Sequence, residues 1–514
     1  MLVKTYGAAV NGLNATPVTV EINSAPGVQF YMVGLPDDAV KESHERIVAA
    51  FGNSGYTFPQ QRITINLAPA DIRKEGSGYD LPIAIGTLAL EGVIKEPEKL
   101  SRYMMVGELS LDGSLQPIKG ALPIAIKARE IGYEGLIVPH QNVREAAVVN
   151  RLKVYGAENI QQVVGLINGD GSLEPTIIDT RKEFFDHQAI FDLDFEDVKG
   201  QQQVKRAMEV AAAGGHNLIM VGPPGSGKSM MAKRLPSILP PLTLAESLET
   251  TQIHSVSGQL KGDTSLIATR PFRSPHHTVS QVALCGGGAS PQPGEISLAH
   301  NGVLFLDELP EFSRQVLEVM RQPLEDRIIN ISRAKYSVSY PANFMFVASM
   351  NPCPCGYYND PTHRCICTEG QIQRYLGKIS GPLMDRIDLQ VEITPLSFDD
   401  LSKAPKGEPS SVIRQRVIKA RQIQEERYKA YPGVYCNAQM TSKMMHLYAE
   451  PDDQSLDLLR KAMVQLQLSA RAYDRILRVA RTIADLEGTE RIQIHHVAEA
   501  VGYRNLDRGT WGQV

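Results

Sequence analysis

Hydrophobic and polar residues alternate along some segments of the chain and recur at helical spacing along others. In the first third, residues 17–22 and 61–67 alternate in the manner of strands. Residues 37–51 and 122–131 carry apolar side chains every three or four positions, as helices do. This mixture predicts an α/β domain over residues 1–170. The pattern then breaks into Gly, Ser, Pro and charged residues, so 171–187 is predicted to be a linker.

A second α/β pattern follows over residues 188–400. Apolar runs at 217–221, 303–306 and 344–350 predict buried strands, and residues 327–340 alternate on both sides of a short polar centre, which predicts a hairpin. A Pro-, Gly- and Ser-rich linker is predicted at 401–411. Apolar side chains recur at helical spacing before and after that linker, which predicts helices at 313–325, 412–431, 455–468, 470–486 and 491–501. The predicted fold class is therefore multidomain α/β, with an α/β/α core and an α-helical lid over 412–514.

A glycine-rich turn stands between the strand at 217–221 and a helix-forming stretch. Its glycines would let backbone N–H groups turn inward around a triphosphate, and a helix N-terminus adds its positive dipole end. The Lys228 ammonium would reach the β- and γ-phosphates, and the Ser229 hydroxyl would bind Mg²⁺. The predicted ATP-binding residues are Gly222, Pro223, Pro224, Gly225, Ser226, Gly227, Lys228 and Ser229.

Two carboxylates end the strand at 303–306. Asp307 could complete a Mg²⁺ site, and Glu308 could orient and deprotonate an attacking water. A glycine turn and a buried strand with an acidic end are the simpler interpretation. Both motifs occur here in the order that an ATPase requires, which predicts that the chain binds and hydrolyses ATP.

Composition narrows the classes of function that remain. A chain of 514 residues with 43% hydrophobic residues should form about three ordinary domains. No apolar run approaches the roughly 20 residues that cross a bilayer, and the first residues lack the order of a signal peptide. We therefore expect a cytoplasmic protein without a membrane partner. The net charge of −4 means that a nucleic-acid surface would have to be local.

Four of the six cysteines form two close pairs, Cys353 with Cys355 and Cys365 with Cys367. Four thiolates in this arrangement suit tetrahedral Zn²⁺, and a site with all four positions filled would be structural. His363 could replace one thiolate, and four free thiols are the alternative. The remaining cysteines, 285 and 436, are expected to be ordinary packing residues.

The long interval between Lys228 and Asp307 contains Arg270, Arg273 and a run of glycines and prolines, which predicts a projecting insertion. Arg333 and Lys335 lie near the tip of the predicted hairpin. These four cations could follow a DNA phosphate backbone. A solvated charged surface is the alternative.

Taken together, residues of about 190–505 resemble an AAA+ ATPase of the branch shared by magnesium chelatase and the minichromosome-maintenance helicases. Three phrases of the first third, at 66–71, 74–82 and 107–120, resemble the Lon-protease-type fold. The whole chain resembles the YifB/ComM family. That resemblance implies a homo-hexameric ring with ATP at subunit interfaces, and a DNA helicase that drives branch migration.

The resemblance also implies roles for three further residues. Asn351 would sense the γ-phosphate and help place the water, Arg386 would be an arginine finger, and Arg471 would be a second sensor arginine. For Arg386, a helix-end salt bridge with Asp385 or Asp388 is the alternative.

The Lon-like region lacks the expected protease dyad. Matching the family pattern puts Gly78 at the position of the nucleophilic serine and Leu122 at that of the lysine. Ser77 and Lys119 are near misses, and both would have to shift to meet. A domain without protease chemistry is therefore expected.

The sequence thus predicts a hexameric, Mg²⁺-dependent ATPase that translocates on single-stranded or branched DNA, in homologous recombination or the integration of transforming DNA. Recombination proteins are expected partners. Two alternatives remain: a chelatase-like motor that remodels a partner enzyme, and an ATP-dependent peptidase.

Overall fold

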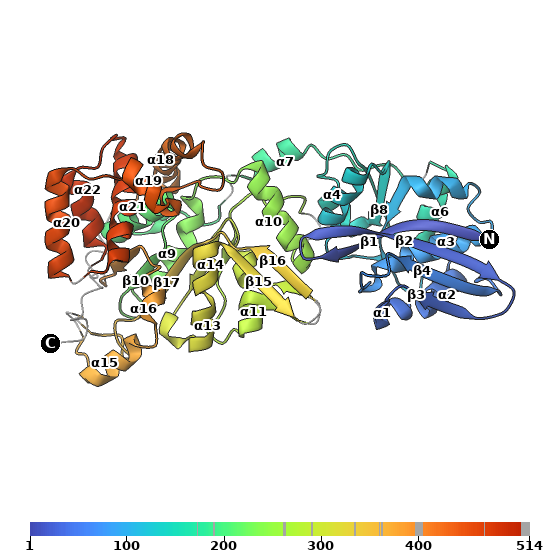
Figure 1. Cartoon of the computed structure of the whole chain (residues 1–514), viewed down its shortest axis with the longest axis horizontal. Coiled ribbons are helices and arrows are strands. Elements are labelled where there is room, and N and C mark those ends of the chain that lie inside the picture. Colours follow the sequence, from blue (N-terminus) through green and yellow to red (C-terminus); the bar gives the residue numbers. More distant parts are fainter. Residues whose placement is uncertain are drawn as a thin grey trace.

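A computed structural model shows an elongated molecule (Figure 1). The N-terminal region lies at one end, the region that contains the glycine-rich turn lies in the middle, and the C-terminal helices lie at the other end. The structure describes residues 1–171, 173–188, 191–260, 264–288, 291–333, 336–358, 360, 363–395, 405–466 and 468–504, without the side chains of residues 187, 333 and 336. No helix in these ranges is long and apolar enough to cross a membrane.

The N-terminal region is built on a four-stranded sheet of order β1-β2-β4-β3. Its strands are β1 (Leu2–Asn11), β2 (Asn14–Ala25), β3 (Phe30–Val33) and β4 (Arg62–Ala68). The predicted alternation at 17–22 is confirmed, because Val18, Val20 and Ile22 are buried. The helix predicted at 37–51 is two helices, α1 (Asp38–Lys41) and α2 (Ser43–Asn53).

Helix α3 (Asp80–Leu90) is buried along almost its whole length and packs on β1 and β2. A parallel sheet of order β5-β8-β9 completes the region. The helix predicted at 122–131 is confirmed as α4, whose bounds differ from the prediction by one residue. The bounds of these elements and their neighbours are β5 (Tyr103–Met105), β6 (Glu108–Leu109), β7 (Leu115–Gln116), α4 (Ala121–Ile131), β8 (Gly135–Pro139), α5 (Val143–Ala146), β9 (Lys153–Ala157) and α6 (Ile160–Asn168).

The middle region contains a five-stranded parallel sheet of order β11-β14-β17-β10-β18. Every position of its three central strands is buried, and every one except Ser349 carries an apolar side chain, as expected for a parallel sheet covered on both faces. The strands are β10 (Leu218–Val221), β11 (Phe272–Arg273), β14 (Val303–Leu306), β17 (Met345–Met350) and β18 (Leu389–Glu392). The carboxyl ends of β10, β14 and β17 therefore meet at one edge, where open α/β sheets bind ligands.

The prediction of a projecting insertion is wrong for residues 270–273, because β11 is the edge strand of this sheet and pairs with β14. The residues that follow are also packed into the core, where Leu284 and Ile296 are fully buried. They form α11 (Gln281–Cys285), β12 (Gly286–Gly287), β13 (Gln292–Pro293) and α12 (Glu295–Leu298).

The hairpin predicted at 327–340 is formed by β15 (Ile328–Arg333) and β16 (Tyr336–Pro341). One face of the hairpin is apolar and buried, whereas Asn330, Ser332 and Ser339 are exposed. The single helix predicted at 313–325 breaks at Met320 into α13 (Arg314–Val319) and α14 (Arg321–Asp326).

The C-terminal helices α18 (Ser410–Tyr428) and α21 (Ala470–Glu487) pack on α8 (Gln202–Gly214) and share one apolar core with the sheet. Helix α18 begins inside the predicted linker at 401–411, of which residues 401–404 lie outside the described part. The other C-terminal helices are α19 (Ser442–Tyr448), α20 (Asp453–Gln465) and α22 (Ile494–Gly502).

The N-terminal region is docked on α10 (Leu244–Ser257) of the middle region. The buried Glu145 carboxylate accepts hydrogen bonds from the Leu122 N–H at 2.9 Å and from the Ser255 hydroxyl. The predicted linker at 171–187 contains helix α7 (Thr180–His187), whose Phe184 is buried in the same interface. The sequence pattern missed this helix because only one of its two apolar residues, Phe184, is buried, whereas Phe185 is 64% exposed. At a second contact, the β1–β2 turn touches the hairpin through Gly12 and Val338.

Candidate active site

The glycine-rich turn joins β10 to helix α9 (Lys228–Arg234) at the carboxyl edge of the sheet. Gly225 and Gly227 have φ angles of +76° and +90°, which favour glycine. At Gly222 a Cβ atom would come within 2.5 Å of the Ile393 carbonyl oxygen. The Ser226 hydroxyl is buried and has no hydrogen-bond partner in the described part of the chain. An unsatisfied donor inside such a loop fits a phosphate oxygen.

Lys228 folds back into this loop. Its ammonium donates to the carbonyl oxygens of Gly222 and Pro223 at 2.8 Å each and to the Asn351 Oδ1 at 3.2 Å. Burial lowers the pKa of Lys228, and the carboxylates of Asp307 and Glu308 act in the opposite direction. The ammonium thus lies where phosphate oxygens could replace the carbonyl groups as its partners.

Asp307 is held by hydroxyl groups from two other elements. Its carboxylate accepts a hydrogen bond from the Ser229 hydroxyl at 2.5 Å, one from the Ser349 hydroxyl of β17, and one from the Glu308 N–H at 3.0 Å. A carboxylate next to a serine hydroxyl is the donor set that Mg²⁺ takes in phosphate-loop ATPases. Ser349 was not predicted, since the sequence offers only its place two residues before Asn351.

Glu308 follows in a left-handed conformation, with φ of +53°, and its side chain is 56% exposed. This backbone turns the carboxylate away from the strand, so that its Oε2 lies 3.7 Å from the Nδ1 of His277. The His277 ring also lies near His276 and Phe312. Sequence reasoning did not select His277, because nothing local indicates that it reaches the end of β14.

The structure therefore brings five predicted residues to one place. Lys228 and Asn351 share a hydrogen bond, Ser229 and Asp307 share another, and Glu308 adjoins them. They come from α9 and from the ends of β14 and β17, which lie far apart in the sequence.

Arg386 and Arg471 lie at the opposite edge of the sheet. The Arg386 carbonyl accepts a hydrogen bond from Asn217, which directly precedes β10, whereas Lys228 follows the far end of that strand. Four strand residues separate the two edges by about 13 Å. The Arg386 guanidinium pairs with Glu325, not with Asp385 or Asp388, and Arg471 pairs with Asp385 at 3.1 Å. The structure thus groups these two arginines with each other and not with Lys228 of the same chain.

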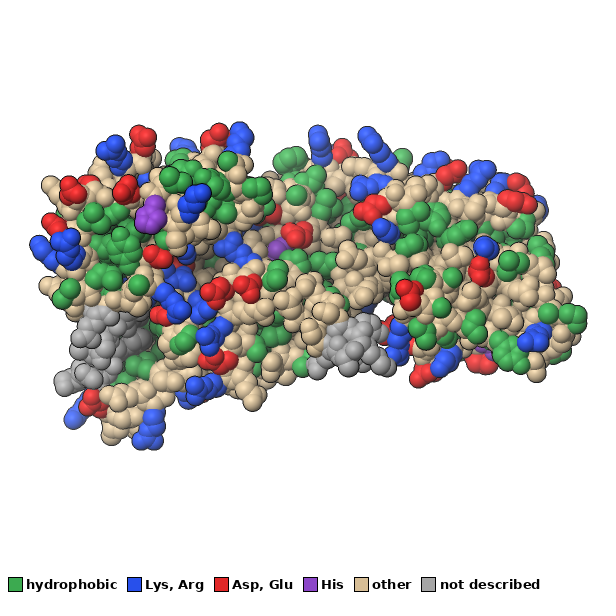
Figure 2. All heavy atoms as spheres, viewed as in Figure 1, with side chains coloured by type: hydrophobic (Ala, Val, Ile, Leu, Met, Phe, Trp, Pro, Cys, Tyr) green, Lys and Arg blue, Asp and Glu red, His purple; other side chains and the backbone are tan. Residues whose placement is uncertain are grey.

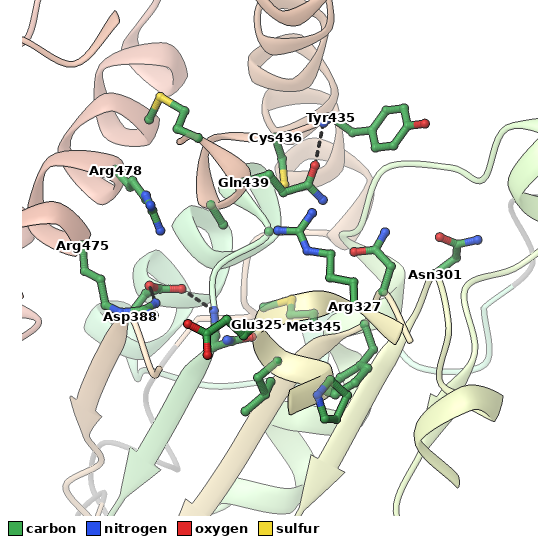
Figure 3. Close-up of a pocket in the computed structure, with 18 of the residues that line it drawn as sticks. Asn301, Glu325, Arg327, Met345, Asp388, Tyr435, Cys436, Gln439, Arg475 and Arg478 are labelled. Atoms are coloured by element: carbon green, nitrogen blue, oxygen red, sulfur yellow. Dashed lines mark hydrogen bonds and ion pairs between the residues drawn. The ribbon is translucent and has the colours of Figure 1, made fainter. Parts of the chain in front are cut away.

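A cavity of about 550 Å³, lined in part by Arg471, lies between the amino edge of the sheet and the C-terminal helices (Figure 3). Figure 2 shows basic and acidic side chains gathered in the hollow between these parts. Asp388 is almost fully buried there, accepts from the Asn217 N–H at 2.9 Å and pairs with Arg475. Burial would raise the pKa of Asp388, but Arg475, His216 and the Asn217 N–H outweigh it and hold the pKa far below its usual range.

The proposed DNA contacts need correction. Arg270 lines this cavity, and its guanidinium donates to the carbonyls of Pro240 and Asn301 at 2.7 Å each and pairs with Glu246. Arg273 forms two hydrogen bonds of 2.6 Å with Glu295. Both are occupied by protein acceptors, since they belong to the sheet edge and not to a projecting insertion. Lys335 and the side chain of Arg333 lie outside the described residues.

The four paired cysteines converge as predicted. Their Sγ atoms, from Cys353, Cys355, Cys365 and Cys367, all lie within 4.8 Å of one another. The other two described cysteines are separate: Cys436 is buried, and burial raises the pKa of the half-buried Cys285 to about 11. His363 instead stacks on the Tyr357 ring and lies 3.6 Å from Asp360. The structure thus favours the all-cysteine set over the set with a histidine.

The residues considered for peptidase chemistry do not form a catalytic pair. The Ser77 hydroxyl donates to the Glu108 carboxylate, and Lys119 lies against Gly258 of the middle region. Leu122 is fully buried in the core. Across the described segment from 74 to 122 no serine hydroxyl forms a hydrogen bond with a lysine, so the geometry gives no support to a peptidase.

Comparisons with known proteins match this arrangement. The family described as magnesium chelatase, subunit ChlI, matches residues 194–401, and two further ChlI families match residues 19–142 and 407–504. The chain is 44% identical to protein YifB of Salmonella typhimurium over 506 residues, which cover 97% of this chain and 96% of that protein. It is 44% identical to competence protein ComM of Haemophilus influenzae, over 98% of this chain and 97% of that protein. A shorter match, 32% identical over 157 residues, links 28% of this chain to 27% of Lon protease 2 of Bacillus subtilis.

Proposed function

The chain belongs to the YifB/ComM family of magnesium-chelatase-like proteins, and from this premise we propose that it is an ATP-driven DNA motor. The observation that carries the ATPase part is the junction of three strand ends. There Lys228 meets Asn351, and Ser229 meets Asp307, beside an unsatisfied Ser226 hydroxyl.

Each residue of this junction has a role in the proposal. ATP and Mg²⁺, when bound, supply the phosphoanhydride bond and a cation that neutralises charge on the phosphates. Lys228 and Ser226 bind phosphate oxygens, and Ser229 and Asp307 hold the metal. Glu308 accepts a proton from the attacking water, and Asn351 helps to orient that water.

We further propose that the active site is completed by a second copy of the chain. The Arg386 carbonyl is held by Asn217 at the amino end of β10, about 13 Å along that strand from the end that leads into the phosphate loop, and Arg471 pairs with Asp385 next to Arg386. A cation needed at the γ-phosphate would then come from a neighbouring protomer, as in ring ATPases. A homo-hexameric ring provides this arrangement at every interface.

The proposed DNA contact is the hairpin β15–β16. The hairpin leads through β17 directly to Asn351, so a movement of one could be transmitted to the other. Its outward face carries polar residues, and in the sequence Arg333 ends the first strand of the hairpin and Lys335 falls between the two strands. One relative is a competence protein, and the corresponding role here would be to move single-stranded or branched DNA during recombination or DNA uptake, together with recombination proteins.

The test is ATP turnover without DNA and with single strands, duplex and a four-way junction. We expect DNA to stimulate turnover in the wild type and not in Lys335→Ala. Lys429→Ala, which removes a cation that is 75% exposed on another surface, is the matched control.

One alternative retains support from a specific observation. Arg270 and Arg273 are occupied by protein partners, which reduces the cations left for DNA, and the family takes its name from a chelatase subunit. Turnover that is insensitive to every DNA would favour a motor that remodels a partner enzyme.

A further inference from the structure

The cysteine cluster lies against the phosphate loop. Cys353 follows Asn351 by two residues and is fully buried. Gly356, within the cluster loop, has φ of +88° and approaches Pro224 so closely that a Cβ atom would lie 2.5 Å from the Pro224 Cδ. The loop that carries the thiols therefore touches both the residue expected to sense the γ-phosphate and the turn expected to surround the phosphates.

The spacing of the thiols fits a tetrahedral metal site. The Sγ atom of Cys353 lies 3.4 Å from that of Cys355 and 3.7 Å from that of Cys365, and the Cys355 and Cys365 sulfurs are 3.6 Å apart. Four sulfurs at about 2.3 Å from Zn²⁺ would be about 3.8 Å apart. The Cys355 N–H also donates to the Cys367 Sγ at 3.4 Å, which would stabilise negative charge on that thiolate.

The described part of this loop has little apolar core of its own. Cys353 is buried, but the other three cysteines are partly exposed and Ile366 is 83% exposed. A loop of this kind depends on a cross-link to keep one conformation, and a metal held by both of its ends supplies one.

We propose that Zn²⁺ bound by the four cysteines holds Gly356 against Pro224 and thereby fixes the phosphate loop for ATP. The inference rests on the proposed ATP-binding function. The metal takes no part in hydrolysis, because four thiolates leave no open position for water or substrate. It acts as a positioning element, and ATP affinity is the quantity that it controls.

The test measures zinc content and the affinity for a fluorescent ATP analogue in the full chain. Cys365→Ser is expected to lose the metal and to bind the analogue at least about tenfold more weakly, since ordering even one loop residue on binding costs about that factor. Gly356→Ala is expected to keep the metal and to weaken binding similarly, because the added Cβ displaces Pro224. Cys285→Ser, which changes a cysteine outside the cluster, should alter neither quantity.

Each outcome decides a separate point. Absence of zinc from wild type purified without chelator overturns the metal site. Metal-free Cys365→Ser with wild-type affinity overturns the coupling while leaving the ATPase proposal intact. Wild type that holds zinc but binds no ATP analogue overturns the proposed function and the coupling with it. Should Cys365→Ser not fold, removal of zinc from the folded wild type by a chelator gives the same comparison, with Gly356→Ala as the metal-retaining arm.

Discussion

Replacing Glu308 with glutamine should separate ATP binding from ATP hydrolysis. The substitution keeps the shape of the side chain but removes its ability to accept a proton. General-base catalysis is typically worth a factor of 10² to 10⁴, or about 2.7 to 5.4 kcal/mol of activation free energy. We therefore expect turnover to fall by at least about a hundredfold.

The structure predicts that stability and binding will be preserved. The Glu308 side chain is 56% exposed and its Oε2 lies 3.7 Å from the Nδ1 of His277, so the loss of charge should change the free energy of unfolding by less than about 0.5 kcal/mol. The carboxylate also lies near the Lys228 ammonium. Removing a negative charge beside the phosphate loop should leave the affinity for ATP unchanged or increase it.

The assay combines phosphate release with equilibrium binding of a fluorescent ATP analogue. Glu311→Gln is the matched control, since Glu311 lies three residues further on, is 45% exposed and pairs with Lys378. The control should keep turnover close to that of the wild type. A Glu308→Gln protein that binds ATP and hydrolyses it within tenfold of the wild-type rate would refute the assignment, and another group would have to activate the water.

Three further predictions concern other parts of the molecule. Arg386→Ala should lower ATP turnover by about a thousandfold or more while the affinity for ATP is retained. Mixing the Arg386→Ala protein with Lys228→Ala protein should restore activity only if the arginine serves a neighbouring protomer. Arg374→Ala, which changes an exposed arginine, is the control. Asp388→Asn should lower the free energy of unfolding at pH 7 by about 3 kcal/mol. The difference in free energy of unfolding between the variant and the wild type should shrink below about pH 4. The reason is that a carboxylate with a lowered pKa stabilises the fold only while it is ionised. Glu145→Ala should cost about 1–3 kcal/mol in urea unfolding, through the unpaired Leu122 N–H and Ser255 hydroxyl, whereas the exposed Glu130→Ala should cost almost nothing.

The junction of Lys228, Asp307 and Asn351 could be predicted from the sequence because each residue follows a short, almost wholly apolar strand, Lys228 after the glycine-rich turn. Parallel strands bring their carboxyl ends to one edge, so a pattern read locally fixes a contact between distant residues. The convergence of the four cysteines could also be predicted, because the segment between the two close pairs is short and keeps the pairs near each other. In both cases the local signal and the distant contact agree.

The edge strand β11 shows where this reasoning fails. Two residues, Phe272 and Arg273, are too few to produce a periodic pattern, and the surrounding glycines and prolines indicate a loop. The strand exists because it pairs with β14, about thirty positions further along the chain. That pairing fixes the segment which leads to His277 and places Arg273 beside Glu295. Without it, sequence reasoning assigned these cations to an insertion and overlooked the histidine next to Glu308.

One continuous segment of chain joins the features on which the proposals depend. It runs from the hairpin β15–β16 through β17 to Asn351 and then into the cysteine loop, which returns to the phosphate loop at Pro224. Strand β17 lies between β14 and β10, so it cannot shift without disturbing the ends that carry Asp307 and the glycine-rich turn. The N-terminal region reaches the same segment, because Gly12 of its β1–β2 turn packs on Val338 of the hairpin. In the proposed DNA motor, a load applied to the hairpin would act at once on the nucleotide site and on the N-terminal region, and would give that region a mechanical role that requires no peptidase chemistry.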